Sequence, residues 1–432
     1  MKPVLNFQLI FLSIFGLIAL VSFVVFAGLL PFPKKDAGGA ASLSGNVVVW
    51  GTLPQETVRP YFEEFNSDKL IIEYKAIEQN KFDDVLLNAL ATDTGPDLIL
   101  WGHQNIIRHR DKLLLILYQN LSRGAFQNTF IRSSSILVQD DGILALPILA
   151  DPMLLFSNNR ILSSSYIAKV PEDWDGVQEA VKKITRLTDS GKIIQSGIAF
   201  GAEHNIYNTK EILSALIFQQ GLEIVSLVDN SVDLAGNVNG QATSAEDAFS
   251  FFTTFSNPAA EIYSWNTSLP ESRGMFISGN LGFYVGHAMD MNEILAKNPN
   301  LDFSVSVLPQ RSEDLDRVTS GKLYVLAMTN NAARNIDAAT YVYFQFAYSP
   351  MMKDLAQSLN LAPAHRDLLA DPGDDDFLET LYNSALIMQT WFDPDEEETR
   401  KFFNRAVRSI RSGAAEVGDA VNTLSGEISR LL

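Results

Sequence analysis

Cysteine is absent from the 432 residues of this chain. A structural disulfide, a zinc site built from thiolates and an anchor through a lipid-modified cysteine are therefore excluded. The five histidines lack the spacing of metal ligands. The acidic clusters at 374–376 and 393–398 lack the glycine and the spacing of a calcium loop. The sequence thus predicts no metal site and no cofactor.

Catalytic motifs are also missing. Gly321-Lys322 is followed by Leu323, which excludes a phosphate-binding loop, and there is neither an HExxH nor a GxSxG motif. A glycosidase would need two facing carboxylates, and 51 acidic residues neither exclude nor identify such a pair. We therefore expect a protein that is not an enzyme and predict no catalytic residue.

Charged side chains are absent from Pro3 to Pro33, and Ile10–Leu30 is almost wholly apolar. About 20 apolar helical residues are enough to cross a bilayer. A cleaved signal peptide has a shorter apolar region of about 7–15 residues, so the length favours an uncleaved transmembrane helix over residues 1–33. Residues 34–45 are small and polar, which is typical of a flexible linker. The sequence therefore predicts a single-pass membrane protein.

The net charge limits the classes of partner that the protein is expected to bind. The formal net charge is −18, whereas phosphate binding needs clustered cations, so nucleic acid is not expected as a partner. Acidity of this kind keeps an exposed domain soluble. With 47% hydrophobic residues, the chain is long enough for two lobes or domains.

After the linker, short strands alternate with amphipathic helices. The expected strands are Val47–Trp50, Leu70–Tyr74 and Leu98–Trp101. Such alternation predicts a parallel sheet, and ligands bind beyond the carboxyl ends of parallel strands. Trp50 and Trp101 lie at such ends, and a glycine follows each of them. We interpret both as ligand contacts; the alternative is that they are core residues.

The segment Ile143–Asn158 contains two apolar stretches separated by Asp151-Pro152. We expect two strands here, with the chain crossing from one lobe to the other. A second crossing is expected near Ser306–Gln310. Asp151 is a candidate ligand residue at the hinge; alternatively, it caps a turn before Pro152.

Several motifs follow one another in the order and spacing typical of one family. They are Gly95–His103 (GPDLILWGH), Leu144–Asn159 (LALPILADPMLLFSNN), Val170–Trp174 (VPEDW), Met275–Asn280 (MFISGN), and Asn298–Phe303 (NPNLDF) leading to Leu308-Pro309-Gln310. Together they resemble the bacterial extracellular solute-binding proteins of the sugar-binding class, the maltose-binding-protein-like family. The resemblance covers residues 46–432.

The resemblance implies an α/β protein with the two-lobed fold of periplasmic binding proteins. Each lobe would be a mostly parallel sheet flanked by helices, and two or three crossovers would join the lobes around a ligand cleft. We expect residues 46–147 and 310–370 to form lobe 1. Residues 148–309 and 371–432 would form lobe 2.

The resemblance also implies ligand-contacting residues. Trp101 falls at the family's sugar-stacking tryptophan, Asp151 falls near its acidic residue beside the hinge, and Glu203 and Tyr207 fall in a ligand-contacting loop. Less strongly aligned candidates are Trp265, Tyr284, His287 and Trp391.

The chain departs from the maltose binder in two places. Gln104 and Asn105 stand where that protein has an acidic and a basic ligand residue, and no tryptophan stands near Met289. Gln104 remains a candidate ligand residue, but maltose itself is not predicted.

For the function, the resemblance implies capture of a mono- or oligosaccharide on the extracytoplasmic side of the cell membrane, for delivery to the permease subunits of an ABC importer. A peptide or a polyol is the alternative ligand. A membrane-anchored sensor or scaffold with the same fold, and a polysaccharide hydrolase, are the alternative functions.

Overall fold

The computed structural model describes residues 43–226, 231–232, 234–238, 241–311 and 316–432. The transmembrane helix expected over residues 1–33, and all of the linker except its last three residues, lie outside this part of the chain. Within the described residues, no helix is long and apolar enough to cross a membrane.

Lobe 1 is built on the predicted parallel strands. β1 (Gly45–Gly51) lies between β2 (Leu70–Ala76) and β3 (Leu98–Gly102) and is parallel to both. All three strands were expected from the sequence and are confirmed. The sheet continues through β14 (Thr319–Thr329), which is antiparallel to β3.

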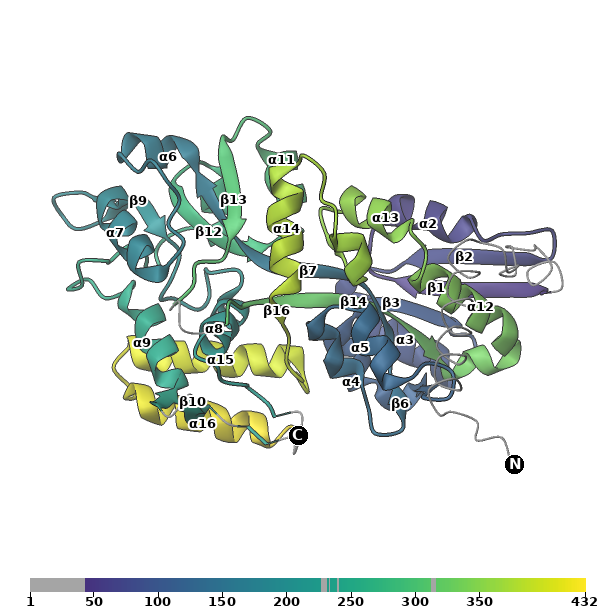
Figure 1. Cartoon of the computed structure of the whole chain (residues 1–432). Coiled ribbons are helices and arrows are strands. Elements are labelled where there is room, and N and C mark those ends of the chain that lie inside the picture. Colours follow the sequence, from purple (N-terminus) through teal and green to yellow (C-terminus); the bar gives the residue numbers. More distant parts are fainter. Residues whose placement is uncertain (1–42, 227–230, 233, 239–240, 312–315) are drawn as a thin grey trace, which may run out of the picture.

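Helices cover this sheet on both faces (Figure 1). They are α2 (Gln55–Glu63), α3 (Gln79–Ala91), α4 (His103–Arg108), α5 (Arg123–Thr129), α12 (Ile336–Ala347) and α13 (Met352–Ser358). Val58 and Phe62 form the buried stripe of α2, because their spacing of four places them on one helix face. The ring of Phe62 stacks on Phe346 of α12 with 3.8 Å between the ring centroids, which joins two distant segments in one core.

Short elements complete lobe 1. They are η2 (Arg110–Lys112), β4 (Leu113–Leu114), β5 (Ile116–Leu117), η3 (Arg132–Leu137), β6 (Gly142–Ile143), η4 (Asn330–Asn335), β15 (Ala362–Pro363) and η5 (Arg366–Leu369).

Asp97 shows what the GPD motif does in the fold. Its carboxylate accepts a hydrogen bond from the backbone N–H of Val48 (2.8 Å), and its own N–H donates to the carbonyl of Val48 (2.9 Å). Its carbonyl accepts from Thr329 of β14. Asp97 thus ties three strands together just before β3, and burial raises the pKa of its carboxyl group.

Lobe 2 is a sheet of mixed direction, so the mostly parallel sheet expected for each lobe is wrong for this one, where most neighbouring strands are antiparallel. β12 (Leu281–His287) is parallel to β9 (Ile193–Ile198), which pairs with the short β8 (Arg186–Leu187). β13 (Phe303–Val307) is antiparallel to β7 (Leu146–Asn158), and β10 (Ala235–Val238) pairs with β11 (Gln241–Ser244).

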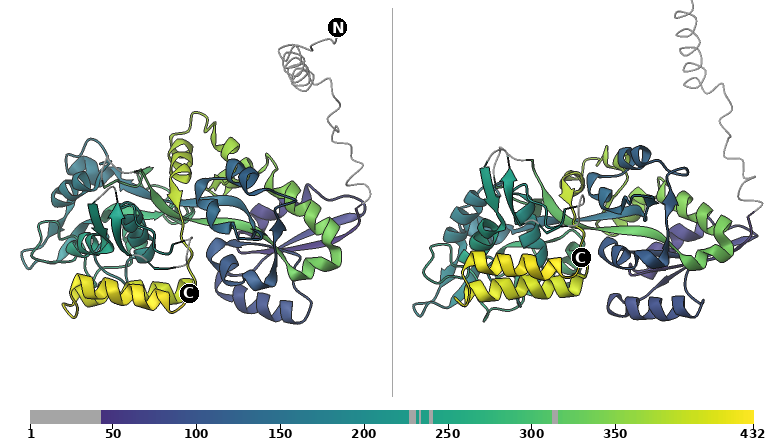
Figure 2. Two further views of the ribbon diagram at one scale, coloured as in Figure 1. Left: turned by 60° about the horizontal axis from the view of Figure 1, so that its bottom comes forward. Right: turned by 90° about the horizontal axis from the view of Figure 1, so that it is seen from below.

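The helices around lobe 2 are α6 (Asn159–Ser164), α7 (Trp174–Ile184), α8 (Thr209–Phe218), α9 (Ala245–Thr254), α10 (Ser272–Ile277), α11 (Asp290–Lys297), α14 (Asp376–Leu386), α15 (Glu396–Arg411) and α16 (Val417–Ser429). The last two lie side by side against this lobe (Figure 2).

The lobes share a continuous strand. The segment expected to form two strands is one strand, β7 (Leu146–Asn158), which is wholly buried and pairs with both sheets (Figure 1). The expected break is wrong because Asp151 and Pro152 stay extended, in register with Lys322 and Gly321 of β14. Asp151 therefore does not cap a turn.

The chain returns between the lobes along β14, later than the Ser306–Gln310 segment expected from the sequence. Ser306 lies in β13, which pairs with the lobe-2 half of β7. A third connection follows α14, where β16 (Met388–Gln389) pairs with the beginning of β14. The exact lobe limits given above stay a prediction.

The close approach at Gly321 predicts a sensitive position. A Cβ atom there would lie 2.7 Å from the backbone carbonyl oxygen of Asp151 and would also meet the side chain of Met388. Gly321→Ala should therefore lower the free energy of unfolding by about 1–3 kcal/mol, measured by urea unfolding. The control is Gly426→Ala in α16, where a Cβ meets nothing within 4 Å and the change should raise stability by up to about 1 kcal/mol. Equal changes in the free energy of unfolding for the two substitutions would contradict the close packing of Gly321 against Asp151.

Candidate ligand-binding site between the lobes

Asp151 lies at the middle of β7, opposite Lys322 of β14. Its side chain is buried, and Oδ1 accepts a hydrogen bond from the backbone N–H of Met289 (3.0 Å). Its backbone oxygen lies 3.1 Å from Nδ1 of His287. Burial is the main cause that raises the pKa of the Asp151 carboxyl group, and the neighbouring His287 opposes it. A carboxylate at the crossing strand is thereby connected to the end of β12.

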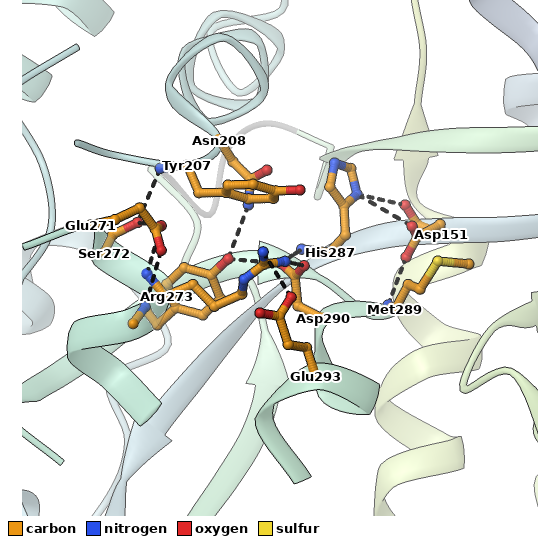
Figure 3. A network of polar contacts seen from close by, with 12 residues as sticks. Asp151, Tyr207, Asn208, Glu271, Ser272, Arg273, His287, Met289, Asp290 and Glu293 are labelled. Atoms are coloured by element: carbon orange, nitrogen blue, oxygen red, sulfur yellow. Dashed lines mark hydrogen bonds and ion pairs between the residues drawn. The ribbon is translucent and has the colours of Figure 1, made fainter. Parts of the chain in front are cut away.

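A polar network continues from β12 into lobe 2 (Figure 3). Asp290, at the start of α11, accepts hydrogen bonds from the Tyr284 hydroxyl (2.7 Å) and from the backbone N–H of His287 (3.1 Å). Its second oxygen accepts from Nη1 of Arg273 (2.8 Å). The Arg273 guanidinium lies over the ring of Tyr207, 4.0 Å from the centroid. The network thus runs without a break from the hinge to an exposed aromatic ring.

A second group of charges joins α8 to the segment before α15. Nζ of Lys210 lies 2.6 Å from Oδ2 of Asp393 and also donates to Thr399 Oγ1 (3.3 Å). Both charged side chains are at most 3% exposed, and the ring of Trp391 lies 5.8 Å from the ammonium group. Burial raises the pKa of Asp393, and Lys210 opposes that rise. The C-terminal segment is thus fastened to lobe 2.

A third group of charged side chains lies near the starts of β14 and α15. Lys322 lies 3.8 Å from Glu396 and makes no other ion pair in the described part of the chain. Burial on its own raises the pKa of Glu396, but Lys322 and Lys210 outweigh it and lower the pKa to about 2. No described residue donates a hydrogen bond to the side chain of Glu211, and its pKa is also lowered by the two lysines against the effect of burial.

Lys322 and Glu211 line a small cavity of about 20 Å³, which also touches His103 and Gln104 of lobe 1. Such a volume holds about one water molecule. Burial lowers the pKa of His103 to about 3, so its ring is neutral, and Nδ1 accepts a hydrogen bond from the backbone of Leu323. Arg108 of α4 reaches Asp395 across the lobes at 3.6 Å.

The structure brings together six of the ten candidate residues. Asp151, Tyr207, Tyr284 and His287 belong to the network of Figure 3, and Gln104 and Trp391 line the small cavity.

The other four are packed inside a lobe. Trp101 is 1% exposed, and its ring contacts Phe82 and His109. Trp50 is buried beside Lys75, and Nε1 of Trp265 donates to Asn205. Glu203 is held by Arg408 and Arg411 of α15. Contact of these four with a ligand stays a prediction, and it would require their neighbours to move.

The sequence reasoning missed Arg273, Lys210, Glu211, Lys322 and Glu396. Two of them could have been noticed in the sequence. Lys210 lies in the first turn of a helix that carries no charge after Glu211, and Lys322 is the one charged residue in β14. A charge in such a segment needs a partner that only the fold can identify.

The comparisons with known proteins agree with this architecture. A family model described as "Bacterial extracellular solute-binding protein" matches residues 60–377. A comparison with curated protein sequences finds no match.

Solved structures share the fold. A cyclo/maltodextrin-binding protein in complex with maltotetraose has a TM-score of 0.72 at 15% identity, covering 92% of this chain and 98% of that one. The cyclic alpha-maltosyl-1,6-maltose binding protein from Arthrobacter globiformis has a TM-score of 0.74 at 14% identity, covering 90% and 99%. The maltose/maltodextrin-binding domain from Bdellovibrio bacteriovorus, bound to maltotriose, has a TM-score of 0.64 at 13% identity, covering 89% and 99%. These similarities confirm the two-lobed fold expected from the sequence.

The Lys210–Asp393 pair predicts a large loss of stability when it is broken. Lys210→Met leaves a buried carboxylate without its cation and should cost about 3–5 kcal/mol of unfolding free energy, measured by urea unfolding. Lys401→Met is the control, because Lys401 is half-exposed and its pairs with Glu397 and Glu398 lie in solvent. That change should cost less than about 1 kcal/mol. Similar losses of unfolding free energy in the two variants would show that the buried Lys210–Asp393 pair contributes no more to stability than an exposed pair.

Proposed function

Because the chain belongs to the family of bacterial extracellular solute-binding proteins, we propose that it captures a mono- or oligosaccharide between its lobes and delivers it to an ABC import permease. The proposal is supported chiefly by the convergence of carboxylate, ammonium, imidazole and amide groups at the strands that cross between the lobes. The ligands named for the structural neighbours, maltotetraose and maltotriose, support a carbohydrate.

The chemistry of these groups suits a sugar. A pyranose has an apolar face of C–H groups and a rim of hydroxyls, so it needs an aromatic ring and several donors and acceptors. Tyr207, a residue that is 52% exposed, offers an aromatic ring. Glu211 and Gln104 offer side chains that receive no hydrogen bond from the described residues, and Lys322 offers an ammonium group whose ion pair with Glu396 is 3.8 Å long.

Closure of the lobes would complete the site. The cavity of about 20 Å³ is far too small for a sugar, but it adjoins a cavity of about 750 Å³, which shares Phe218 and Trp391 with it and is large enough for one. Contacts with both lobes would then favour the closed form, because a ligand shifts a population by its difference in affinity for the two states. We also propose that residues 1–33 anchor the protein, with the lobes on the extracytoplasmic side.

A ligand screen on the full chain tests this function. Maltotriose, mannobiose, glycerol and a tripeptide would be compared by thermal unfolding, and at least one saccharide should raise the midpoint, by the equivalent of about 2.7 kcal/mol at 100 times its dissociation constant. Small-angle scattering should then show a smaller radius of gyration with that saccharide. Tyr207→Ala should weaken binding about tenfold or more, as for an aromatic anchor, and Trp101→Ala tests the family's stacking position.

The other outcomes would contradict the proposal. A midpoint raised only by glycerol or the tripeptide would identify a non-sugar solute. An unchanged midpoint and a constant radius of gyration with every compound would favour a sensor or scaffold.

A further inference from the structure

We propose that Arg273 is a positioning residue that holds the ring of Tyr207 as a one-sided stacking surface for the ligand; this proposal rests on the proposed function. Arg273 lies in α10 and Tyr207 in the loop after β9, so only the fold brings them together. The guanidinium carbon lies 4.0 Å from the centroid of the Tyr207 ring. One face of an otherwise exposed ring is therefore covered by a cation.

Arg273 is itself held in place by two carboxylates. Nη1 lies 2.8 Å from Asp290 Oδ1, and Nη2 lies 2.8 Å from Glu293 Oε2. Its side chain is only 16% exposed. These bonds use the edge of the planar guanidinium, whose N–H groups lie in its plane, and they leave a face free to stack on an aromatic ring. The two carboxylates therefore hold the guanidinium plane of Arg273 in place beside the Tyr207 ring.

The backbone of Tyr207 is fixed next to the same helix. Its N–H donates to the hydroxyl oxygen of Ser272 (3.0 Å), and that hydroxyl donates to Glu271 (3.0 Å). Asn208, the next residue, donates to the hydroxyl of Tyr284 (3.3 Å). Tyr207 therefore has a backbone attachment to α10 and a ring attachment to Arg273, and Figure 3 shows both on one side of the network.

The Tyr207 side chain keeps solvent exposure beyond the face that Arg273 covers. No described residue makes a hydrogen bond with the Tyr207 hydroxyl, and the side chain is half-exposed although it is a large aromatic group. A ring that is held before the ligand arrives loses little freedom on binding, which improves affinity. Because Arg273 covers one face, only the other face can stack on a ligand, so Tyr207 would take one sugar ring.

The position of Tyr207 connects this surface to the hinge. Asp290 binds both Arg273 and the backbone of His287, whose ring lies beside the carbonyl of Asp151 on the crossing strand. Three residues after Tyr207, Lys210 lines the cavity between the lobes. The Tyr207 ring is thus held at a fixed position relative to the polar groups that would bind the hydroxyl groups of the sugar.

The test uses Arg273→Lys, because lysine keeps the positive charge beside Asp290 but has no plane on which the ring can stack. The matched control is Arg186→Lys on β8, an exposed arginine with no ion pair in the described part of the chain. Arg273→Met removes the charge as well and would separate the loss of the ion pairs from the loss of the plane.

The first measurement needs no ligand. The full chain would be labelled with 3-fluorotyrosine, and the Tyr207 resonance would be identified by its loss in Tyr207→Phe. Arg273→Lys should shift and narrow this ¹⁹F resonance while leaving the thermal midpoint close to that of the wild type, and Arg186→Lys should change neither. An unchanged Tyr207 resonance in a folded Arg273→Lys protein would overturn the proposal.

The second measurement uses maltotriose and mannobiose in titration calorimetry. Arg273→Lys should weaken the binding of the saccharide about tenfold, and the same change in a Tyr207→Ala background should have almost no further effect. Independent, additive losses would overturn the positioning role. If neither saccharide binds the wild type, the proposed ligand class is wrong for these sugars, whereas the fluorine measurement still decides whether Arg273 holds the ring.

Discussion

Two opposite charges lie side by side on the strands that join the lobes, Asp151 on β7 and Lys322 on β14. A buried charge costs several kcal/mol unless partners surround it. Asp151 obtains its partners from the end of β12, through the N–H of Met289, whereas Lys322 faces Glu396 at the start of α15. The polar environment between the lobes therefore follows from placing ionisable groups on strands that are otherwise apolar. The same strands also hold the lobes together, so the environment of these charges depends on the angle between the lobes.

Local pattern was enough to predict much of the fold. The period and length of the apolar stretches identified β1, β2 and β3, and their alternation with helices identified the parallel sheet, because each helix has to return the chain to the same edge. The break at Asp151-Pro152 was misread for a physical reason. Aspartate and proline favour turns in isolation, but pairing with β14 on one side and β12 on the other keeps β7 extended.

Side-chain roles were harder to predict, because they depend on contacts between distant segments. Trp101 ends a parallel strand as expected, yet its ring packs between Phe82 and His109. The strand direction fixes where a residue lies, whereas the helices packed beside it decide which way the ring turns. Arg273 illustrates the opposite case: nothing in the segment around it indicates a role, and its meaning comes from Tyr207, Asp290 and Glu293, which belong to other elements.

The distribution of ion pairs suits a protein whose lobes separate. The strong pair, Lys210–Asp393, is almost fully buried and lies within lobe 2 together with the C-terminal helices. Among the described residues, two ion pairs bridge the lobes: Arg108–Asp395 at 3.6 Å and Lys322–Glu396 at 3.8 Å. A partly exposed pair such as Arg108–Asp395 contributes about 0–1 kcal/mol, whereas Lys322 and Glu396 are more buried, and Lys322 is the strongest of the cations that lower the pKa of Glu396. Opening of the lobes would break these two bridging contacts and leave the Lys210–Asp393 pair intact.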